Sequence, residues 1–238
     1  MRFSIDVGGE LELKLQQAIL LYRNEQASRY MATVHGILQS ASGGVPVLGA
    51  GQLITTAVLQ ELARTLGTAC PTEFLPEQVV ARTPELLAWW TPALIRPMFF
   101  RAGSDLADVA GQRFPHPALL FVVRNGLLHV RALRSSQRPN AETKLCAAPY
   151  WNIGNDGAVC AGTMRVPKST GVATMAAWEQ AFFQSEFTHP SGTGRLTKRR
   201  GGTAALWKSL AGKSTFPLTT LVQTESLAAY LRALETRR

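Results

Sequence analysis

Cysteine, histidine and charged residues are all scarce in this chain of 238 residues. The chain has three cysteines, Cys70, Cys146 and Cys160. A small and odd number of cysteines does not make a disulfide scaffold. The four histidines stand far apart and no CxxC or CxxH spacing occurs, so we predict no structural metal and no cofactor. Charged residues make up 17% of the chain, which argues against a disordered chain or a coiled coil.

Long apolar runs are also absent. Nowhere do about 18 apolar residues follow one another, so no membrane-spanning helix is predicted. The first residues, MRFSIDVGGELELKLQQ, lack an apolar segment of signal-peptide length. Apolar residues nevertheless make up 46% of the chain, which is enough for a globular core. We therefore expect a cytoplasmic protein with reduced thiols and no membrane contact.

Positive charge is in excess, and much of the excess lies late in the sequence. The formal net charge is +9, from 25 Lys and Arg residues against 16 Asp and Glu residues. Residues 195–213 carry a basic run, and Arg237 and Arg238 end the chain. This run is either a solvated loop or a surface for an acidic partner. Nucleic acid is possible but not favoured, because the run lacks interleaved aromatic residues for base stacking.

Alternating and apolar runs predict strands in two places. Residues 18–23 and 30–38 are rich in β-formers and indicate a hairpin with a loop of several residues. The runs ALLFVVR and LLHVRAL flank Asn125 and Gly126, the dipeptide that best fits a two-residue type I′ turn. These last strands are apolar on both faces in places, so we expect other elements to cover them.

Helical periodicity predicts five helices. In residues 53–67, Leu59, Leu62, Ala63 and Leu66 form one stripe, which we expect to be buried, with Thr55 or Thr56 as the cap and Gly67 at the end. Thr83, Pro84 and Glu85 resemble a helix start, so a helix is expected over Leu86 to Trp90. The other predicted helices lie at 174–187, where Thr174 is a possible cap, at 202–212 and at 224–236.

The blocks of strands and helices predict an α+β fold in one domain over residues 1–238. We expect antiparallel hairpins or a β-meander packed with flanking helices. An N-terminal hairpin and helix would precede the core, and a helical extension would follow it.

Residues 146–162, CAAPYWNIGNDGAVCAG, place an asparagine eight positions before a cysteine. Between Asn152 and Cys160 lies a turn-forming run, Asn155 to Gly157. One interpretation is a hairpin that carries a buried thiol, because free cysteine is among the most buried residue types. The other is a nucleophile held opposite an amide that stabilises its intermediate. Cys70 and Cys146 are expected to be structural.

This segment resembles the active-site segment of ubiquitin-conjugating enzymes. In that family a His-Pro-Asn triplet precedes a Gly turn and an Ile/Val-Cys pair, and its Asn lies eight positions before its Cys. Phe114 to Pro117 resembles the Tyr-Pro-x-x-Pro element of the same family. Longer stretches resemble PRTRC system protein B, a bacterial family placed in this superfamily as prokaryotic family D. They are residues 75–101, 114–119, 148–162, 181–192 and 199–210.

The resemblance implies a ubiquitin-conjugating-enzyme-like core over about residues 75–190 and a role in a bacterial plasmid- or island-borne cassette. It also implies the partners, which are a ThiF-like activating enzyme, a small ubiquitin-like protein, a JAB-type metalloprotease and a ParB-related protein. Cys160 would take the modifier as a thioester and pass it to an amine. The alternatives are a non-catalytic adaptor of the same fold and a DNA-associated basic protein.

The site residues follow from this chemistry. A thiolate is the strongest ordinary nucleophile at neutral pH, so Cys160 would form the thioester, and the Asn152 amide would stabilise the oxyanion by about 3 kcal/mol. Asp156 would orient or deprotonate the amine, or would only shape the turn. Tyr150 and Trp151 stand where the family has His and Pro, and Ala161 replaces its usual Leu. Tyr150 supplies a polar tip or only packs, and His189 is a candidate for the rim.

Overall fold

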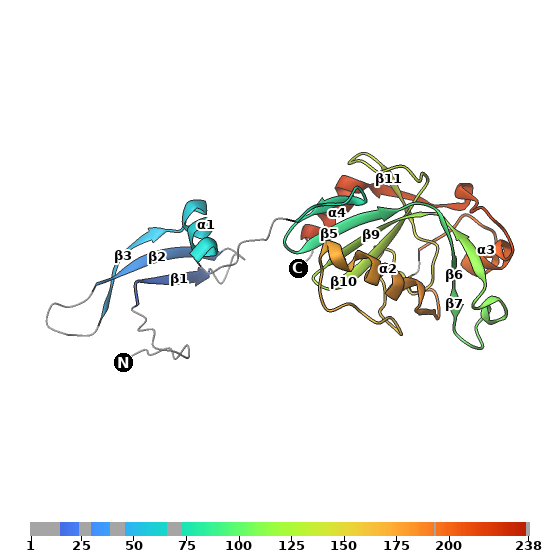
Figure 1. Ribbon diagram of the computed structural model, residues 1–238, viewed down its shortest axis with the longest axis horizontal. Helices are drawn as coiled ribbons and strands as arrows, with labels where there is room; N and C mark the ends of the chain where they lie inside the picture. The colour runs from blue at the N-terminus through green and yellow to red at the C-terminus, as the bar shows by residue number, and fades with distance from the viewer. Residues whose placement is uncertain (1–14, 24–29, 39–45, 66–72, 193, 237–238) are drawn as a thin grey trace. The chain divides into compact units, whose positions relative to one another are not determined.

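The computed structural model describes residues 15–23, 30–38, 46–65, 73–192 and 194–236 (Figure 1). The chain groups into two compact units, residues 1–72 and 73–238. The single domain over residues 1–238 stays a prediction. No helix in the described part of the chain is long and apolar enough to cross a membrane.

The first unit is a three-stranded antiparallel sheet followed by a helix. β1 (Gln17–Arg23) pairs with β2 (Tyr30–Leu38), which confirms the predicted hairpin. β3 (Val47–Leu53) adds to the other edge of β2 and precedes α1 (Thr56–Thr65).

The start of α1 is as predicted, but its apolar stripe is not buried. The Val58 N–H donates to Oγ1 of Thr55 at 3.4 Å, so Thr55 caps the helix. Leu59 is 52% exposed, and none of the described residues of this unit is buried. The prediction of a buried stripe is therefore wrong for its described members, because three strands and one short helix enclose too little volume to form a core. Leu66, Gly67 and Cys70 lie outside the described residues.

The second unit is built on a six-stranded antiparallel sheet, as the predicted α+β class requires. Two short strand pairs, β6 with β8 and β12 with β7, stand beside it. The sheet has the order β13 (Gln223–Ser226), β11 (Lys144–Ala147), β10 (Leu127–Leu133), β9 (Ala118–Arg124), β5 (Leu86–Thr91) and β4 (Val79–Arg82). The short strands are β6 (Leu94–Pro97), β7 (Phe99–Phe100), β8 (Arg113–His116) and β12 (Glu186–Phe187).

The central hairpin of the sheet confirms the prediction from the Asn-Gly pair. Arg124 at the end of β9 pairs with Leu127 at the start of β10, so the loop has two residues. Asn125 has φ 49° and Gly126 has φ 75°, and two positive φ angles in succession define the type I′ turn.

Residues 86–90 form a strand, so the helix predicted there is wrong. β5 is buried along its whole length, and an apolar run without alternation cannot be told from a buried helix by periodicity. The Thr83-Pro84-Glu85 sequence instead makes the turn between β4 and β5. The Thr83 N–H donates to the Leu86 carbonyl at 2.8 Å, and Oγ1 of Thr83 accepts from the Leu86 N–H at 3.1 Å.

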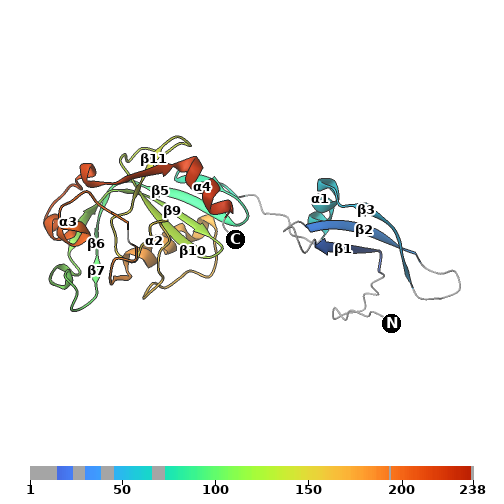
Figure 2. The same cartoon turned by 180° about the vertical axis from the view of Figure 1, so that it is seen from behind.

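Each face of the sheet carries a different set of buried side chains and a different helix. Leu87, Trp89 and Phe121 point into the larger cluster, which α2 (Met175–Phe183) and α3 (Gly202–Leu210) complete. Leu86, Ala88 and Trp90 point the other way, into a cluster closed by α4 (Leu227–Thr236). Figures 1 and 2 show α2 and α4 on these opposite faces.

The helices α2, α3 and α4 have the predicted apolar faces, but their ends differ from the predicted ends. α2 ends at Phe183, before the predicted limit, because Glu186 and Phe187 pair with β7. Thr174 makes no side-chain hydrogen bond that caps α2. α4 begins at Leu227, because residues 223–226 form the edge strand β13.

Candidate active site

The segment that ends at Cys160 completes the edge of β10. β11 pairs with Arg131 and Ala132 of that strand. Two backbone hydrogen bonds of 2.8 Å join residues 157–159 to residues 128–130, the part of β10 that does not pair with β11. Cys160 therefore follows directly after a paired stretch, at the point where the chain leaves the sheet.

The predicted turn between Asn152 and Cys160 closes on itself. The Cys160 N–H donates to the Asn152 carbonyl at 2.8 Å, and the Gly154 N–H donates to the Ala158 carbonyl at 2.9 Å. Within the turn, Oδ1 of Asp156 accepts from the Ala158 N–H at 3.1 Å. The eight-residue spacing thus brings the backbones of Asn152 and Cys160 side by side.

The two described cysteines lie in opposite environments. Cys160 is exposed, whereas Cys146 on β11 is buried with 0% exposure. Burial raises the pKa of the Cys146 thiol, because the thiolate loses its hydration. The buried structural thiol is therefore Cys146, and Cys160 is the thiol that another molecule can reach.

The Asn152 side chain is buried, at 4% exposure, and its orientation is determined by its partners. Oδ1 accepts from the Thr188 N–H at 3.0 Å and from the Thr188 hydroxyl at 2.8 Å. Because a backbone N–H can only donate, the atom it meets must be the amide oxygen. Nδ2 donates one hydrogen to the Glu186 carbonyl at 2.8 Å.

The Asn152 amide nitrogen also lies close to Gly162. A Cβ atom on Gly162 would lie 3.9 Å from Nδ2 and 3.9 Å from the Cys160 carbonyl oxygen. The amide nitrogen therefore lies beside the turn that follows Cys160, and no side chain of Gly162 fills the space next to it. Asn152 itself has φ 60°, a left-handed conformation that asparagine tolerates better than most residues.

The tip of the turn is held by α4. The Tyr230 hydroxyl donates to the Asp156 carbonyl at 2.8 Å, and a Cβ atom on Gly157 would lie 2.6 Å from the Tyr230 oxygen. Burial raises the pKa of Tyr230, so this hydroxyl keeps its proton and remains a donor. Gly157 has φ 87°, so both its conformation and its close contact favour glycine.

Arg131 of β10 supports the same tip. Its Nη1 donates to the Asn155 carbonyl at 3.0 Å, and its Nη2 lies 3.0 Å from Oε1 of Glu225. The guanidinium carbon stands 4.7 Å from the centroid of the Tyr230 ring, a cation–π distance. Arg131 is 5% exposed, whereas the Glu225 side chain is 35% exposed, so the buried guanidinium is paired with a carboxylate at the surface.

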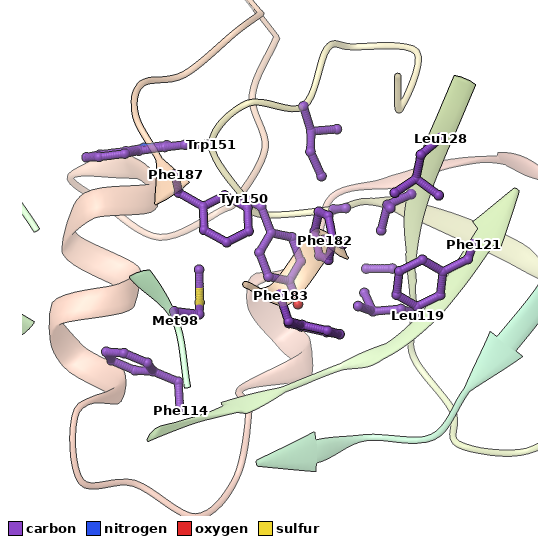
Figure 3. Close-up of a cluster of buried hydrophobic side chains, with 14 of the residues drawn as sticks. Met98, Phe114, Leu119, Phe121, Leu128, Tyr150, Trp151, Phe182, Phe183 and Phe187 are labelled. Carbon is purple, nitrogen blue, oxygen red and sulfur yellow. The ribbon is translucent and has the colours of Figure 1, made fainter. Parts of the chain in front are cut away.

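Tyr150 lies in the aromatic core, where Figure 3 shows it among Phe182, Phe183 and Phe187. Its side chain is fully buried, and its hydroxyl lies 2.9 Å from Nδ1 of His116. Burial raises its pKa well above the usual value for tyrosine. Of the two alternatives for Tyr150, packing fits this position.

Trp151 and His189 both lie next to Asn152 and line the same cavity. The Trp151 indole N–H donates to Oγ1 of Thr203 in α3 at 2.9 Å, and this bond is buried. The Asn152 N–H donates to the His189 carbonyl at 2.9 Å, so His189 lies next to the site as the sequence suggested. Thr188 and Glu186 were missed, because a contact across 34 or 36 residues leaves no periodic signal.

The basic run is partly tied to its own backbone. The Arg195 guanidinium donates to the carbonyls of Thr197 and Lys198 at 2.9 and 3.0 Å. Lys208 Nζ lies 3.9 Å from Oδ1 of Asp108, and both side chains are exposed. Among the described residues, no group of three or more His, Cys, Asp and Glu side chains is arranged to hold a metal ion.

Comparison with known proteins agrees with this geometry at the level of the family. No curated protein and no solved structure shows a significant match. The model of prokaryotic E2 family D matches residues 55–224, well over half of the chain, and the match includes the whole segment from Asn152 to Cys160. The chain therefore belongs to prokaryotic E2 family D, a family of proteins related to ubiquitin-conjugating enzymes.

Proposed function

We propose that this protein carries a ubiquitin-like modifier as a thioester on Cys160 and transfers it to an acceptor amine. One observation supports the proposal: a backbone hydrogen bond of 2.8 Å joins Cys160, an exposed residue, to Asn152, whose side-chain amide has an orientation determined by its partners. A thiol that only packs would be buried, as Cys146 is.

The first step is a thiol–thioester exchange, in which the modifier moves from the sulfur of the activating enzyme to the sulfur of Cys160. The Cys160 thiolate attacks the carbonyl carbon of the modifier on the activating enzyme, the new C–S bond forms, and the old one breaks with its electron pair on the donor sulfur. The two thioesters are close in energy, so a modest thiolate fraction is sufficient and no base needs to touch the sulfur. The exposure of Cys160 is what a donor of protein size requires.

The second step places negative charge on the carbonyl oxygen of the thioester. When an amine attacks, the tetrahedral intermediate carries an oxyanion that needs a donor already in place. Nδ2 of Asn152 donates one hydrogen to the Glu186 carbonyl, and the nitrogen lies 3.9 Å from the position of a Cβ atom on Gly162. We assign oxyanion stabilisation to the second hydrogen of Nδ2, with a contribution of about 3 kcal/mol.

The remaining predicted residues take supporting roles. Asp156 uses Oδ1 within the turn, and its carbonyl oxygen binds Tyr230, so we propose that it shapes the turn that holds Cys160. We assign no chemical step to Tyr150, whose hydroxyl is buried against His116.

The proposal extends to the partners. We propose that this chain is a PRTRC system protein B, supplied by a ThiF-like activating enzyme and a small ubiquitin-like protein. A JAB-type metalloprotease would process or remove that modifier, and a ParB-related protein would share the cassette. The basic run over residues 195–213 would contact an acidic surface on one of these partners.

A charging reaction tests the proposal. The protein is mixed with the activating enzyme, ATP and the modifier, and the products are separated with and without a reducing thiol. We expect an adduct that the thiol removes, that Cys160→Ala abolishes and that Cys146→Ala retains. Full activation of the modifier without any adduct on this protein would contradict transfer and leave the non-catalytic adaptor.

A further inference from the structure

We propose that His189 is the general base of the transfer step, and that the cavity it lines receives the acceptor amine. This inference rests on the proposed function, because it concerns the discharge of the Cys160 thioester. Loss of charging and loss of discharge are separate observations, so the two proposals can fail independently.

The hydrogen bonds around Asn152 determine which nitrogen of His189 carries the proton. Oδ1 of Asn152 accepts from the Thr188 hydroxyl at 2.8 Å, so that hydroxyl has already used its only hydrogen. Nδ1 of His189 lies 2.8 Å from the same hydroxyl oxygen. The hydroxyl can only accept there, so Nδ1 carries the hydrogen and Nε2 of the neutral ring carries the lone pair. A base needs such a lone pair.

Asn152 also connects His189 to Cys160 through the backbone. Its carbonyl accepts from the Cys160 N–H at 2.8 Å, and its own N–H donates to the His189 carbonyl at 2.9 Å. Cys160 and His189 are therefore each one backbone hydrogen bond away from Asn152.

A cavity of about 440 Å³ opens beside His189 and is lined by Thr188, Trp151, Asp105 and the first residues of α3. His189 is exposed, so its imidazole is accessible from this side. Asp105 and His189 are the titratable side chains among the described lining residues. The carboxylate of Asp105 would attract the ammonium group of a lysine, which identifies a primary amine as the substrate class.

The charged surroundings include cations as well. Arg199 and Arg200 immediately precede Gly201, which lines the same cavity, and both side chains are exposed. They would repel a free ammonium group, so Asp105 is the residue that favours its entry. Loss of its proton to Nε2 of His189 then gives the neutral amine that attacks.

The step balances without a further reagent. The amine nitrogen bonds to the thioester carbonyl carbon, and its proton goes to Nε2 of His189. The C–S bond breaks and leaves its electron pair on the Cys160 sulfur as a thiolate. The products are an amide, a thiolate and an imidazolium that returns its proton to water.

Single-turnover discharge tests this inference. The thioester on Cys160 is formed first, activation is stopped, and free L-lysine is added as the amine. His189→Asn is the matched variant, because its side-chain amide keeps a donor where Nδ1 stands and offers no base. We expect discharge to fall about 10²-fold in the variant, while its charging, which involves no amine, serves as the internal reference.

The bond to Thr188 separates a base from a structural residue, because His189→Asn keeps a donor toward the Thr188 hydroxyl and loses only the lone pair. Equal discharge rates in wild type and variant would overturn the role of His189 and leave the thioester intact as a finding. A loss of charging as large as the loss of discharge would also overturn it, since it would indicate positioning. Absence of any thioester would overturn the proposed function itself.

Discussion

Cys146 and Cys160 lie on two segments that both pair with β10. The two thiols are chemically identical, but their surroundings differ. Ala132 of β10 pairs with Cys146 on β11, whose thiol points into the aromatic core. Residues 157–159 pair further along the same strand, and Cys160 follows where that pairing stops. A thiol inside the sheet is inert, whereas one just beyond it is accessible.

The difference teaches where the fold leaves a cysteine exposed. β10 is shared between β11 and the segment of residues 157–159, and the second of these is irregular and short. Arg131, Tyr230 and the Thr188 backbone hold that segment and the Asn152 amide from three sides. An exposed residue with a well-determined position is what a covalent carrier needs.

Alkylation of the folded protein gives the largest expected contrast. In a Cys70→Ser background, iodoacetamide should modify Cys160 at least about 10³-fold faster than Cys146, because Cys146 reacts only when the core opens. Mass spectrometry of the digested protein gives both rates. Equal rates, or slower modification of Cys160, would remove the distinction between the two thiols.

Removal of the Asn152 amide has the next largest effect. Asn152→Ala should lower the rate of thioester discharge about 10²-fold, since it removes the oxyanion donor. The substitution also leaves the Thr188 N–H and the Glu186 carbonyl without their partner, at a cost of about 2 kcal/mol in unfolding free energy.

Thr188→Val is the matched control for this prediction. The comparison is made in a His189→Asn background, because the Thr188 hydroxyl also contacts Nδ1 of His189. There the substitution removes one of the bonds to Oδ1 and keeps the amide itself, so it should reduce stability with a smaller effect on discharge than Asn152→Ala. Discharge that is equally slow in the two variants would indicate that Asn152 acts only through the structure of the loop.

Gly157 and Gly126 have similar φ angles but different surroundings. Comparing them separates the cost of a steric contact from the cost of a left-handed backbone conformation. Gly157→Ala should lower the unfolding free energy by about 2 to 3 kcal/mol, because its Cβ would lie 2.6 Å from the Tyr230 oxygen at a φ of 87°. Gly126→Ala, at a φ of 75° with no atom within 4 Å, should cost about 1 kcal/mol. Denaturant titration measures both.

The contact with Tyr230 can be isolated by a second substitution. Tyr230→Phe removes the hydroxyl that the new methyl group would meet, so it should cost less in the Gly157→Ala protein than in the wild type. Additive effects would show that the two residues do not interact.

The interior around Tyr150 should be sensitive to acid. Burial lowers the pKa of His116 to about 4, from 6.5 in an exposed histidine. Between these values the unfolded chain binds more protons than the folded chain, so stability falls as the pH falls through that window. We expect a loss of about 2 kcal/mol in unfolding free energy between about pH 7 and pH 5.

His116→Asn should be less stable than wild type at neutral pH but should lose less stability on acidification. Denaturant titrations of both proteins at the two pH values measure this. An equal loss in wild type and variant would show that His116 is not the group that titrates.

Local signals in the sequence were sufficient for much of the fold. Asn125 and Gly126 specify a turn through their backbone preferences, and the apolar stripes of α2, α3 and α4 follow a period that no strand shares. The strand over Leu86 to Thr91 was missed because it is apolar from Leu86 to Trp90, with no polar residue alternating between the apolar ones. The stripe of α1 was predicted to be buried because periodicity shows which side chains share a face and not what covers it.

Only the part of the candidate site that is continuous in sequence could be predicted. The spacing between Asn152 and Cys160 identified both ends of the turn, and the backbone hydrogen bond between them follows from that spacing. Thr188, Tyr230 and Arg131 reach the site from distant segments, and nothing local in their sequence indicates it. For Tyr150 and Asp156 the sequence left a chemical and a structural role open, because adjacency in sequence does not tell where a side chain points; Tyr150 lies against His116, and Asp156 accepts from the Ala158 N–H.

The covalent linkage of the modifier is the most direct test of the account. The adduct from the charging reaction is digested under acidic conditions that preserve thioesters, and the modified peptide is identified by mass spectrometry. We predict that the modifier's C-terminal carbonyl is attached to Cys160 and that hydroxylamine releases it. Attachment to Cys146, Cys70 or a lysine of this protein, with Cys160 unmodified, would contradict the assignment of Cys160 as the carrier.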